Sequence, residues 1–195
     1  MSIDYNDVEF AYTQGDQHIT RTLYLKDRKT SRGALGIWRV DVLWSWKVYR
    51  SRRQLQRLYG DYQRADTAGL PMDKPRFVVG RIRSRGRTTS GFVLIARWME
   101  GTQFLNKATS FRAALDAQMM PHDRTDQNYI RTTAGCLAAQ SVGLRDCQGF
   151  VKMGERESLQ FFDIHTRWNP IYNIFGSSIQ ADALVQVIES WESSI

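Results

Sequence analysis

The sequence predicts an α+β fold of two lobes, a β-rich N-terminal lobe over residues 1–99 and a reduced helical C-terminal lobe over residues 100–195. Strand-like patterns fill the first hundred residues, and helix-like patterns dominate the remainder. The charge changes at the same place. Residues 1–97 carry 19 Lys and Arg against 9 Asp and Glu, a net +10, whereas residues 98–195 carry 8 against 11, a net −3. The basic first half suggests that it handles a polyanion, which could be nucleotide phosphate, nucleic acid or an acidic protein.

The strand predictions begin with residues 8–25, which alternate loosely around a Gly-Asp turn and predict two strands. Residues 26–36, KDRKTSRGALG, form a basic loop that contains glycine. Residues 37–51 are rich in β-branched and aromatic side chains and predict one strand. This part of the chain therefore predicts three strands before the first helix.

The first helix is predicted over residues 52–70, where Leu55, Leu58, Tyr59 and Tyr62 recur at helical spacing before a Gly-Leu-Pro stop. Two further strands follow, over residues 76–84 and 90–99. The N-terminal lobe is thus expected to read β-β-β-α-β-β.

The C-terminal lobe is predicted to hold helices over residues 110–120, 123–143 and 178–195. The second of these begins with Asp and Thr caps and ends at a glycine, and the third is amphipathic. Residues 143–166 predict a hairpin between them, with a strand-like run over residues 158–162.

Composition narrows the class of protein. At 42% hydrophobic residues, the chain can bury a packed core. No apolar run approaches the ~18 residues that cross a bilayer, and the acidic start MSIDYNDVEF does not resemble a secretory signal. The two cysteines lack metal-site spacing. We therefore expect a cytoplasmic protein without membrane association.

Several charged and glycine residues suggest a site that handles phosphate. Asp146 and Asp163 end the tripeptides Leu-Arg-Asp and Phe-Phe-Asp, 17 residues apart, at the two ends of the predicted hairpin. Lys47 lies among aromatic and apolar residues on a predicted strand, where a charge is out of place unless it has a function. Gly33 and Gly36 would let backbone N–H groups approach phosphates closely.

This order of elements and motifs resembles the protein-kinase-like fold, including its aminoglycoside-phosphotransferase relatives, over nearly the whole chain. The reduced C-terminal lobe resembles that of the minimal kinases among bacterial effectors. This resemblance adds, as an alternative to a cytoplasmic location, export of this chain to a host cell by a route that is independent of a signal peptide. The resemblance implies a five-stranded N-lobe with one helix, a hinge and a helical C-lobe. It also implies an ATP- and Mg²⁺-dependent phosphotransferase that acts on a protein hydroxyl.

The resemblance assigns the nucleotide contacts to the N-lobe and the hinge. Lys47 would contact the α- and β-phosphates, and Gly33 and Gly36 would cover the phosphates. Met99 and Glu100 would bind the adenine edge through their backbone groups. The helix after Lys47 carries two acids, Asp61 and Asp66. The spacing from Lys47 to Asp66 is near the family's usual interval, so the resemblance favours Asp66 as the ion-pair partner of Lys47.

The resemblance assigns the catalytic and metal-binding roles to residues of the predicted hairpin. Asp146 would orient the attacking hydroxyl and accept its proton, with Arg145 completing the Arg-Asp pair, and Asp163 would hold Mg²⁺. The family carries a second metal ligand, Asn, where this chain has Val151. Gln148 is the nearby amide that would supply an oxygen instead; if it does not, the chain is a pseudokinase.

The alternative is a non-catalytic binding module in which the basic half grips nucleic acid or an acidic protein partner. Paired aspartates favour the phosphotransferase, because carboxylates repel a phosphate backbone. The arginines that would form the basic surface are Arg50, Arg52, Arg53, Arg57, Arg81, Arg83, Arg85 and Arg87.

Overall fold

The computed structural model of the chain describes residues 8–14, 16–27, 34–39, 44–49, 51–84, 86–97, 101–105, 107–118, 127–152, 158–166 and 180–192. These residues form antiparallel sheets and helices, so the α+β class is confirmed. The chain divides into two compact units. The first comprises Met1–Tyr59 and Lys74–Trp98, and the second comprises Gly60–Asp73 and Met99–Ile195.

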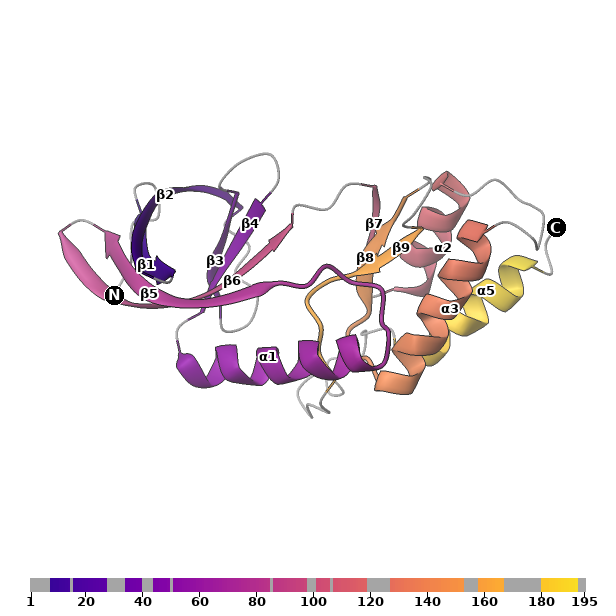
Figure 1. The fold of residues 1–195 in the computed structure, drawn as a ribbon. Helices are drawn as coiled ribbons and strands as arrows, with labels where there is room; N and C mark the ends of the chain where they lie inside the picture. The colour runs from indigo at the N-terminus through magenta and orange to yellow at the C-terminus, as the bar shows by residue number, and fades with distance from the viewer. Residues whose placement is uncertain are drawn as a thin grey trace, which may run out of the picture. The chain divides into compact units, whose positions relative to one another are not determined.

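The first unit contains a closed antiparallel barrel with the strand order β1-β2-β3-β4-β6-β5 (Figure 1). Pairing of β1 with β5 closes the barrel, because Glu9 lies opposite Arg83 and Ala11 opposite Arg81. Closure leaves these strands without an exposed hydrogen-bonding edge. The strands are β1 (Val8–Gln14), β2 (Gln17–Asp27), β3 (Ala34–Arg39), β4 (Trp44–Tyr49), β5 (Arg76–Ser84) and β6 (Arg87–Arg97).

The prediction of one strand over residues 37–51 is wrong. This run forms parts of two strands, β3 and β4, which pair as a hairpin with Trp38 opposite Trp46 and Ile37 opposite Lys47. The barrel consequently has six strands where the resemblance implied five. A continuous run of β-prone residues does not mark the point at which the chain reverses, since both strands share the same composition.

Two facing glycines make room for an aromatic ring in the barrel core. Gly80 of β5 lies opposite Gly91 of β6, and the fully buried Phe10 of β1 packs over both. A Cβ at Gly80 would lie 2.6 Å from the Phe10 ring and 2.3 Å from the carbonyl oxygen of Ala11. No other residue type fits at this close approach.

The predicted first helix is confirmed as α1 (Arg52–Thr67). It begins at Ser51, whose Oγ accepts a hydrogen bond of 3.2 Å from the N–H of Gln54. It ends at Gly69, whose φ of 74° is the left-handed conformation that terminates helices. The residues up to Tyr59 belong to the first unit, and the last two turns belong to the second.

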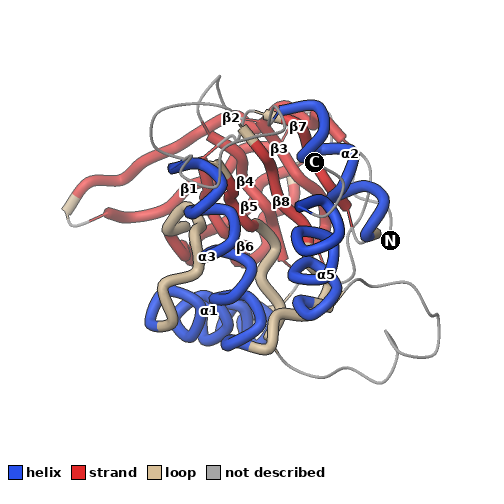
Figure 2. Tube along the Cα trace, turned by 90° about the vertical axis from the view of Figure 1, so that its right-hand side faces the viewer, coloured by secondary structure: helices blue, strands red, loops and turns tan. Residues whose placement is uncertain are grey.

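The second unit pairs a three-stranded antiparallel sheet, in the order β7-β8-β9, with helices (Figures 1 and 2). Its core forms around Phe104, whose ring lies 4.8 Å from that of Phe111 and 6.1 Å from that of Phe161. The predicted hairpin and the three predicted helices are present, whereas β7 was not predicted. The elements are β7 (Thr102–Leu105), α2 (Ala108–Gln118), α3 (Gln127–Val142), β8 (Gln148–Val151), β9 (Leu159–Phe161) and α5 (Ala181–Glu192).

The helices of the second unit are joined by aromatic and polar contacts. The rings of Tyr129 in α3 and Trp191 in α5 stack at 6.1 Å, and the Trp191 indole N–H donates a 2.9 Å hydrogen bond to Asp116 of α2. Across the described ranges, no helix is long and apolar enough to cross a membrane.

Candidate functional site

The two predicted catalytic segments face each other across a short antiparallel ladder in the second unit. At one end, Arg145 is bridged to His165, and its N–H donates a 2.7 Å hydrogen bond to the His165 carbonyl. At the other end, Gly149 of β8 lies opposite Phe161 of β9. Three residues separate these pairs on each strand, and the regular pairing is interrupted between them.

Asp146 and Asp163 lie on the two facing segments between these pairs, each in a bend of the backbone. Both aspartates have left-handed backbones, with φ of 59° and 54°, and in the described part of the chain they are the two non-glycine residues with positive φ. This conformation costs an L-residue roughly 1–2 kcal/mol. Such strain persists only where the surroundings hold it, and it concentrates at active sites and ligand clamps.

Gln148 directs its side chain at the Asp163 carboxylate. Its Nε2 donates a hydrogen bond of 3.3 Å to Asp163 Oδ2, and only 9% of the Gln148 surface is exposed. Val151, which occupies the position of the family's second metal ligand, is fully buried and lies opposite Leu159 in the sheet. Gln148 is therefore the amide that lies beside Asp163.

The remaining contacts of the ladder involve His165 and Arg145. His165 Nε2 lies 3.6 Å from Asp163 Oδ1, within ion-pair distance when the imidazole is protonated. The Arg145 guanidinium donates a 2.8 Å hydrogen bond to Oε1 of Gln180, the residue that precedes α5. Arg145 thus links the ladder to α5 through its side chain and to the Asp163 segment through its backbone.

Cys147 lies between Asp146 and Gln148 but cannot act as a nucleophile at neutral pH. Its side chain is fully buried, and its Sγ lies 3.7 Å from the carbonyl oxygen of Leu144. Burial, and then the charge of Asp146, raise the pKa of the thiol to about 12. Because the thiolate is the reactive species, this cysteine has a structural role.

The last two turns of α1 support the Asp163 segment from its other side. Tyr62 is buried, and the backbone N–H groups of Asp163 and Ile164 donate hydrogen bonds to its hydroxyl oxygen. Burial, and then the negative charge of Asp163, raise the pKa of Tyr62 well above its ordinary value. The phenol therefore stays protonated and can also donate a hydrogen bond.

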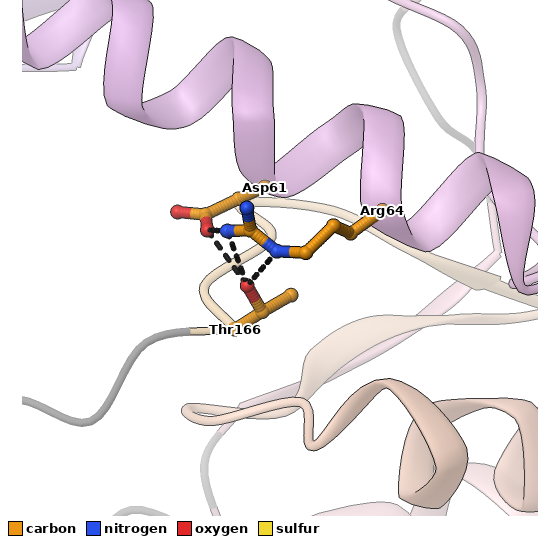
Figure 3. A network of polar contacts seen from close by, with 3 residues as sticks. All are labelled: Asp61, Arg64 and Thr166. Atoms are coloured by element: carbon orange, nitrogen blue, oxygen red, sulfur yellow. Dashed lines mark hydrogen bonds and ion pairs between the residues drawn. The ribbon is translucent and has the colours of Figure 1, made fainter.

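A second contact from α1 holds Thr166, three residues beyond Asp163 (Figure 3). The Thr166 hydroxyl donates a 2.7 Å hydrogen bond to Oδ1 of the buried Asp61 and accepts from Nε and Nη2 of Arg64 at 3.0 and 2.7 Å. Arg64 Nη2 also pairs with Asp61. Sequence reasoning missed this network and the role of Tyr62. The Asp61–Arg64 spacing marks a helical ion pair, but nothing in the sequence links that pair to Thr166.

The predicted nucleotide-contacting residues that the structure describes lie in the first unit. Lys47 is partly exposed on β4, with its Nζ 5.8 Å from the centroid of the Tyr49 ring. Gly36, expected in a loop, lies within β3 opposite Val48, and the next pair along this hairpin is Ile37 with Lys47. Gly36 and Lys47 are thus close neighbours. Of the other predicted contacts, Gly33, Met99 and Glu100 lie outside the described residues.

The site offers oxygen donors suited to a hard cation. In the part of the chain that the structure describes, no group of three or more His, Cys, Asp or Glu side chains is placed to hold a metal ion. Mg²⁺ needs fewer protein ligands, because it retains waters and binds through one or two carboxylates together with substrate phosphates. Asp163 supplies one such carboxylate. The Gln148 amide presents its Nε2 to Asp163, so its oxygen would become a second ligand only if the amide turned over and gave up that hydrogen bond.

Comparisons with known proteins provide no relative from which a function could be assigned. No family model, no curated protein and no solved structure matches this chain. The function is accordingly inferred from the residues of the ladder and their neighbours.

Proposed function

We propose that this chain is an ATP- and Mg²⁺-dependent phosphotransferase with a minimal protein-kinase-like fold, acting on a protein hydroxyl. The observation that carries this proposal is the pair of left-handed aspartates, Asp146 and Asp163, on facing segments of one ladder. Aspartates with a strained, left-handed backbone are expected at positions where their carboxylates bind a ligand or take part in catalysis.

The two carboxylates have different surroundings, which suits them to different roles. Asp163 is partly exposed and accepts a hydrogen bond from Nε2 of Gln148, and it would hold Mg²⁺. The Gln148 oxygen would join it as a ligand after the amide turns over and that hydrogen bond is replaced by the metal. Bound Mg²⁺ would neutralise charge on the β- and γ-phosphates. Asp146 is 8% exposed, and it would orient the substrate hydroxyl and accept its proton.

Lys47 is the cation proposed to bind the α- and β-phosphates, and Gly36, beside it on β3, would leave space for them. Arg145 is proposed to act indirectly, since its guanidinium is directed at Gln180.

Radiolabel transfer from γ-labelled ATP to the chain itself or to a generic protein acceptor tests the proposal. Asp146→Asn and Asp163→Asn preserve size and tolerate a left-handed backbone. Each should lower the rate by about 10²–10⁴. Asp16→Asn, the same change at an exposed acid between β1 and β2, is the matched control and should transfer at the wild-type rate. Equal rates in all the variants would place the chemistry elsewhere.

The binding-module alternative has one supporting observation. Arg81 and Arg83 are exposed on the same face of β5, and Arg87 is exposed at the start of β6, although Glu9 lies directly opposite Arg83. Thermal shift separates the two functions. Stabilisation by ATP that requires Mg²⁺ supports the phosphotransferase, whereas salt-sensitive stabilisation by an oligonucleotide without an ATP effect supports the binding module.

Nucleotide binding without phosphoryl transfer would identify a pseudokinase. In that outcome Gln148 does not replace the missing second metal ligand. The distinction is therefore made by measuring binding and transfer on the same preparation.

A further inference from the structure

The segment that carries Asp163 is held at two points by α1. On one side, the Tyr62 hydroxyl accepts hydrogen bonds from the N–H groups of residues 163 and 164. On the other side, Thr166 is bound by Asp61 and Arg64. We name Asp61, Tyr62, Arg64 and Thr166 the α1 clamp. All four residues belong to the second unit.

The clamp accepts hydrogen bonds from backbone groups that lie between two ladder bonds of this segment. In the ladder, the Phe162 N–H donates to the Gln148 carbonyl, and the Arg145 N–H donates to the His165 carbonyl. Between these bonds, the N–H groups of residues 163 and 164 turn toward Tyr62. A buried backbone N–H group without an acceptor carries a desolvation cost. The Tyr62 hydroxyl provides an acceptor and so offsets that cost for this backbone conformation.

The clamp also sets the direction of the Asp163 side chain. A left-handed residue points its Cβ differently from its ladder neighbours. With residues 163 and 164 bonded to Tyr62 and residue 166 bonded to Asp61 and Arg64, the backbone on both sides of the carboxylate is fixed. The carboxylate is then directed at Gln148 on one side and His165 on the other.

We propose that the α1 clamp is a set of positioning residues that hold Asp163 in its left-handed, cation-ready conformation, with Tyr62 and Thr166 as the two anchoring hydroxyls. The metal-binding part of this inference rests on the proposed function. The conformational part does not, so each part has its own measurement.

The conformational part is tested by amide hydrogen exchange resolved for individual residues. Tyr62→Phe removes one hydroxyl and keeps the ring. Tyr59→Phe is the matched control, because it makes the same change on an exposed tyrosine of the same helix whose ring packs on Phe77. Loss of a hydrogen bond predicts exchange at residues 163 and 164 that is about two- to tenfold faster in Tyr62→Phe. Unchanged exchange at both amides would overturn the clamp.

The metal-binding part is tested by titrating Mg²⁺ at fixed ATP and measuring nucleotide binding. Thr166→Val and Tyr62→Phe should each raise the half-saturating Mg²⁺ concentration several-fold, with little change in binding of ATP alone. Thr166→Ser keeps the hydroxyl and should restore the wild-type midpoint. A purely structural role would lower the melting temperature without shifting this midpoint, and that result would overturn the positioning role.

If the proposed function is wrong, the ATP-binding and hydrogen-exchange measurements give a different combination of results. If the wild-type chain shows no Mg²⁺-dependent ATP binding, the phosphotransferase proposal is wrong. Hydrogen exchange in Tyr62→Phe then still decides whether the clamp holds the backbone of Asp163, because that measurement needs no ligand.

Discussion

Replacing Asp163 by glycine should give a more stable protein than replacing it by alanine, the reverse of the usual order. Both changes remove the 3.3 Å hydrogen bond from Gln148. Alanine, however, keeps the cost of the left-handed backbone, where φ is 54°. Glycine adopts this conformation freely.

The size of the difference follows from two opposing terms. Glycine relieves roughly 1–2 kcal/mol of left-handed strain. Relative to alanine, glycine costs about 0.5–1 kcal/mol, because it loses more backbone conformational entropy on folding. The glycine variant should therefore be more stable than the alanine variant by up to about 1.5 kcal/mol, with a central value of about 0.75 kcal/mol, which corresponds to a melting temperature about 2–3 °C higher in a domain of this size.

Urea and thermal denaturation measure this difference, and Ala113→Gly is the control. Ala113 is exposed inside α2, where glycine should cost about 1 kcal/mol relative to alanine. If Asp163→Gly proves less stable than Asp163→Ala, Asp163 does not have a left-handed backbone in solution. Both Asp163 variants should lose Mg²⁺-dependent nucleotide binding, so the glycine variant would combine retained stability with lost function.

The remaining predictions concern three other positions on the ladder and one on α1. Gln148→Ala should weaken Mg²⁺-dependent ATP binding while leaving binding of ATP without metal unchanged; an unaltered Mg²⁺ dependence would mean that Gln148 is not a ligand. Gly60→Ala should stabilise the chain by about 0.5–1 kcal/mol, because the new Cβ inside α1 meets its nearest atom at 3.7 Å. Gly149→Ala should fail to fold or lose several degrees in melting temperature, because its Cβ would lie 2.3 Å from a backbone carbonyl oxygen; normal melting would contradict the close strand packing. Cys147 should resist thiol reagents at pH 8 until urea unfolds the chain, since its pKa is raised from 9.0 to about 12. The stability that this thiol contributes should be complete below pH 9 and decline as pH rises from there toward 12; rapid labelling of the folded protein would contradict its burial.

The candidate site was partly predictable because its residues are close in sequence to the turn that joins them. The strand-like runs around Asp146 and Asp163 predict a hairpin, and a hairpin brings its two ends together. Gln148 was singled out for the same reason. It follows Asp146 by two residues, and the register of the hairpin carries its side chain to Asp163.

The elements that were predicted wrongly lie where the local residue pattern does not show where a strand begins, ends or reverses direction. Residues 37–51 are uniformly β-prone, so the reversal between β3 and β4 left no signal in composition. Gly36 was expected in a loop, yet it lies within β3 at a register shift after Ala34. The strand β7 has four residues, too few for alternation to distinguish it from a loop.

The amino-acid sequence by itself determined the α+β class, the helix α1 and the hairpin with an aspartate at each end, because each depends on periodicity, capping or turn chemistry over a few neighbouring residues. Only the tertiary structure decided that β1 pairs with β5 to close the barrel and that Tyr62, Asp61 and Arg64 hold the segment from Asp163 to Thr166. The contacts of Asp61 and Arg64 with Thr166 join residues about a hundred positions apart in the second unit, and the closing pairs of the barrel join residues 70 to 74 positions apart in the first. Local propensity cannot specify such contacts, since they form only when burial of the whole core brings distant segments into register. The left-handed backbone of Asp163 lies next to those distant contacts, and the tripeptide Phe-Phe-Asp alone does not predict it.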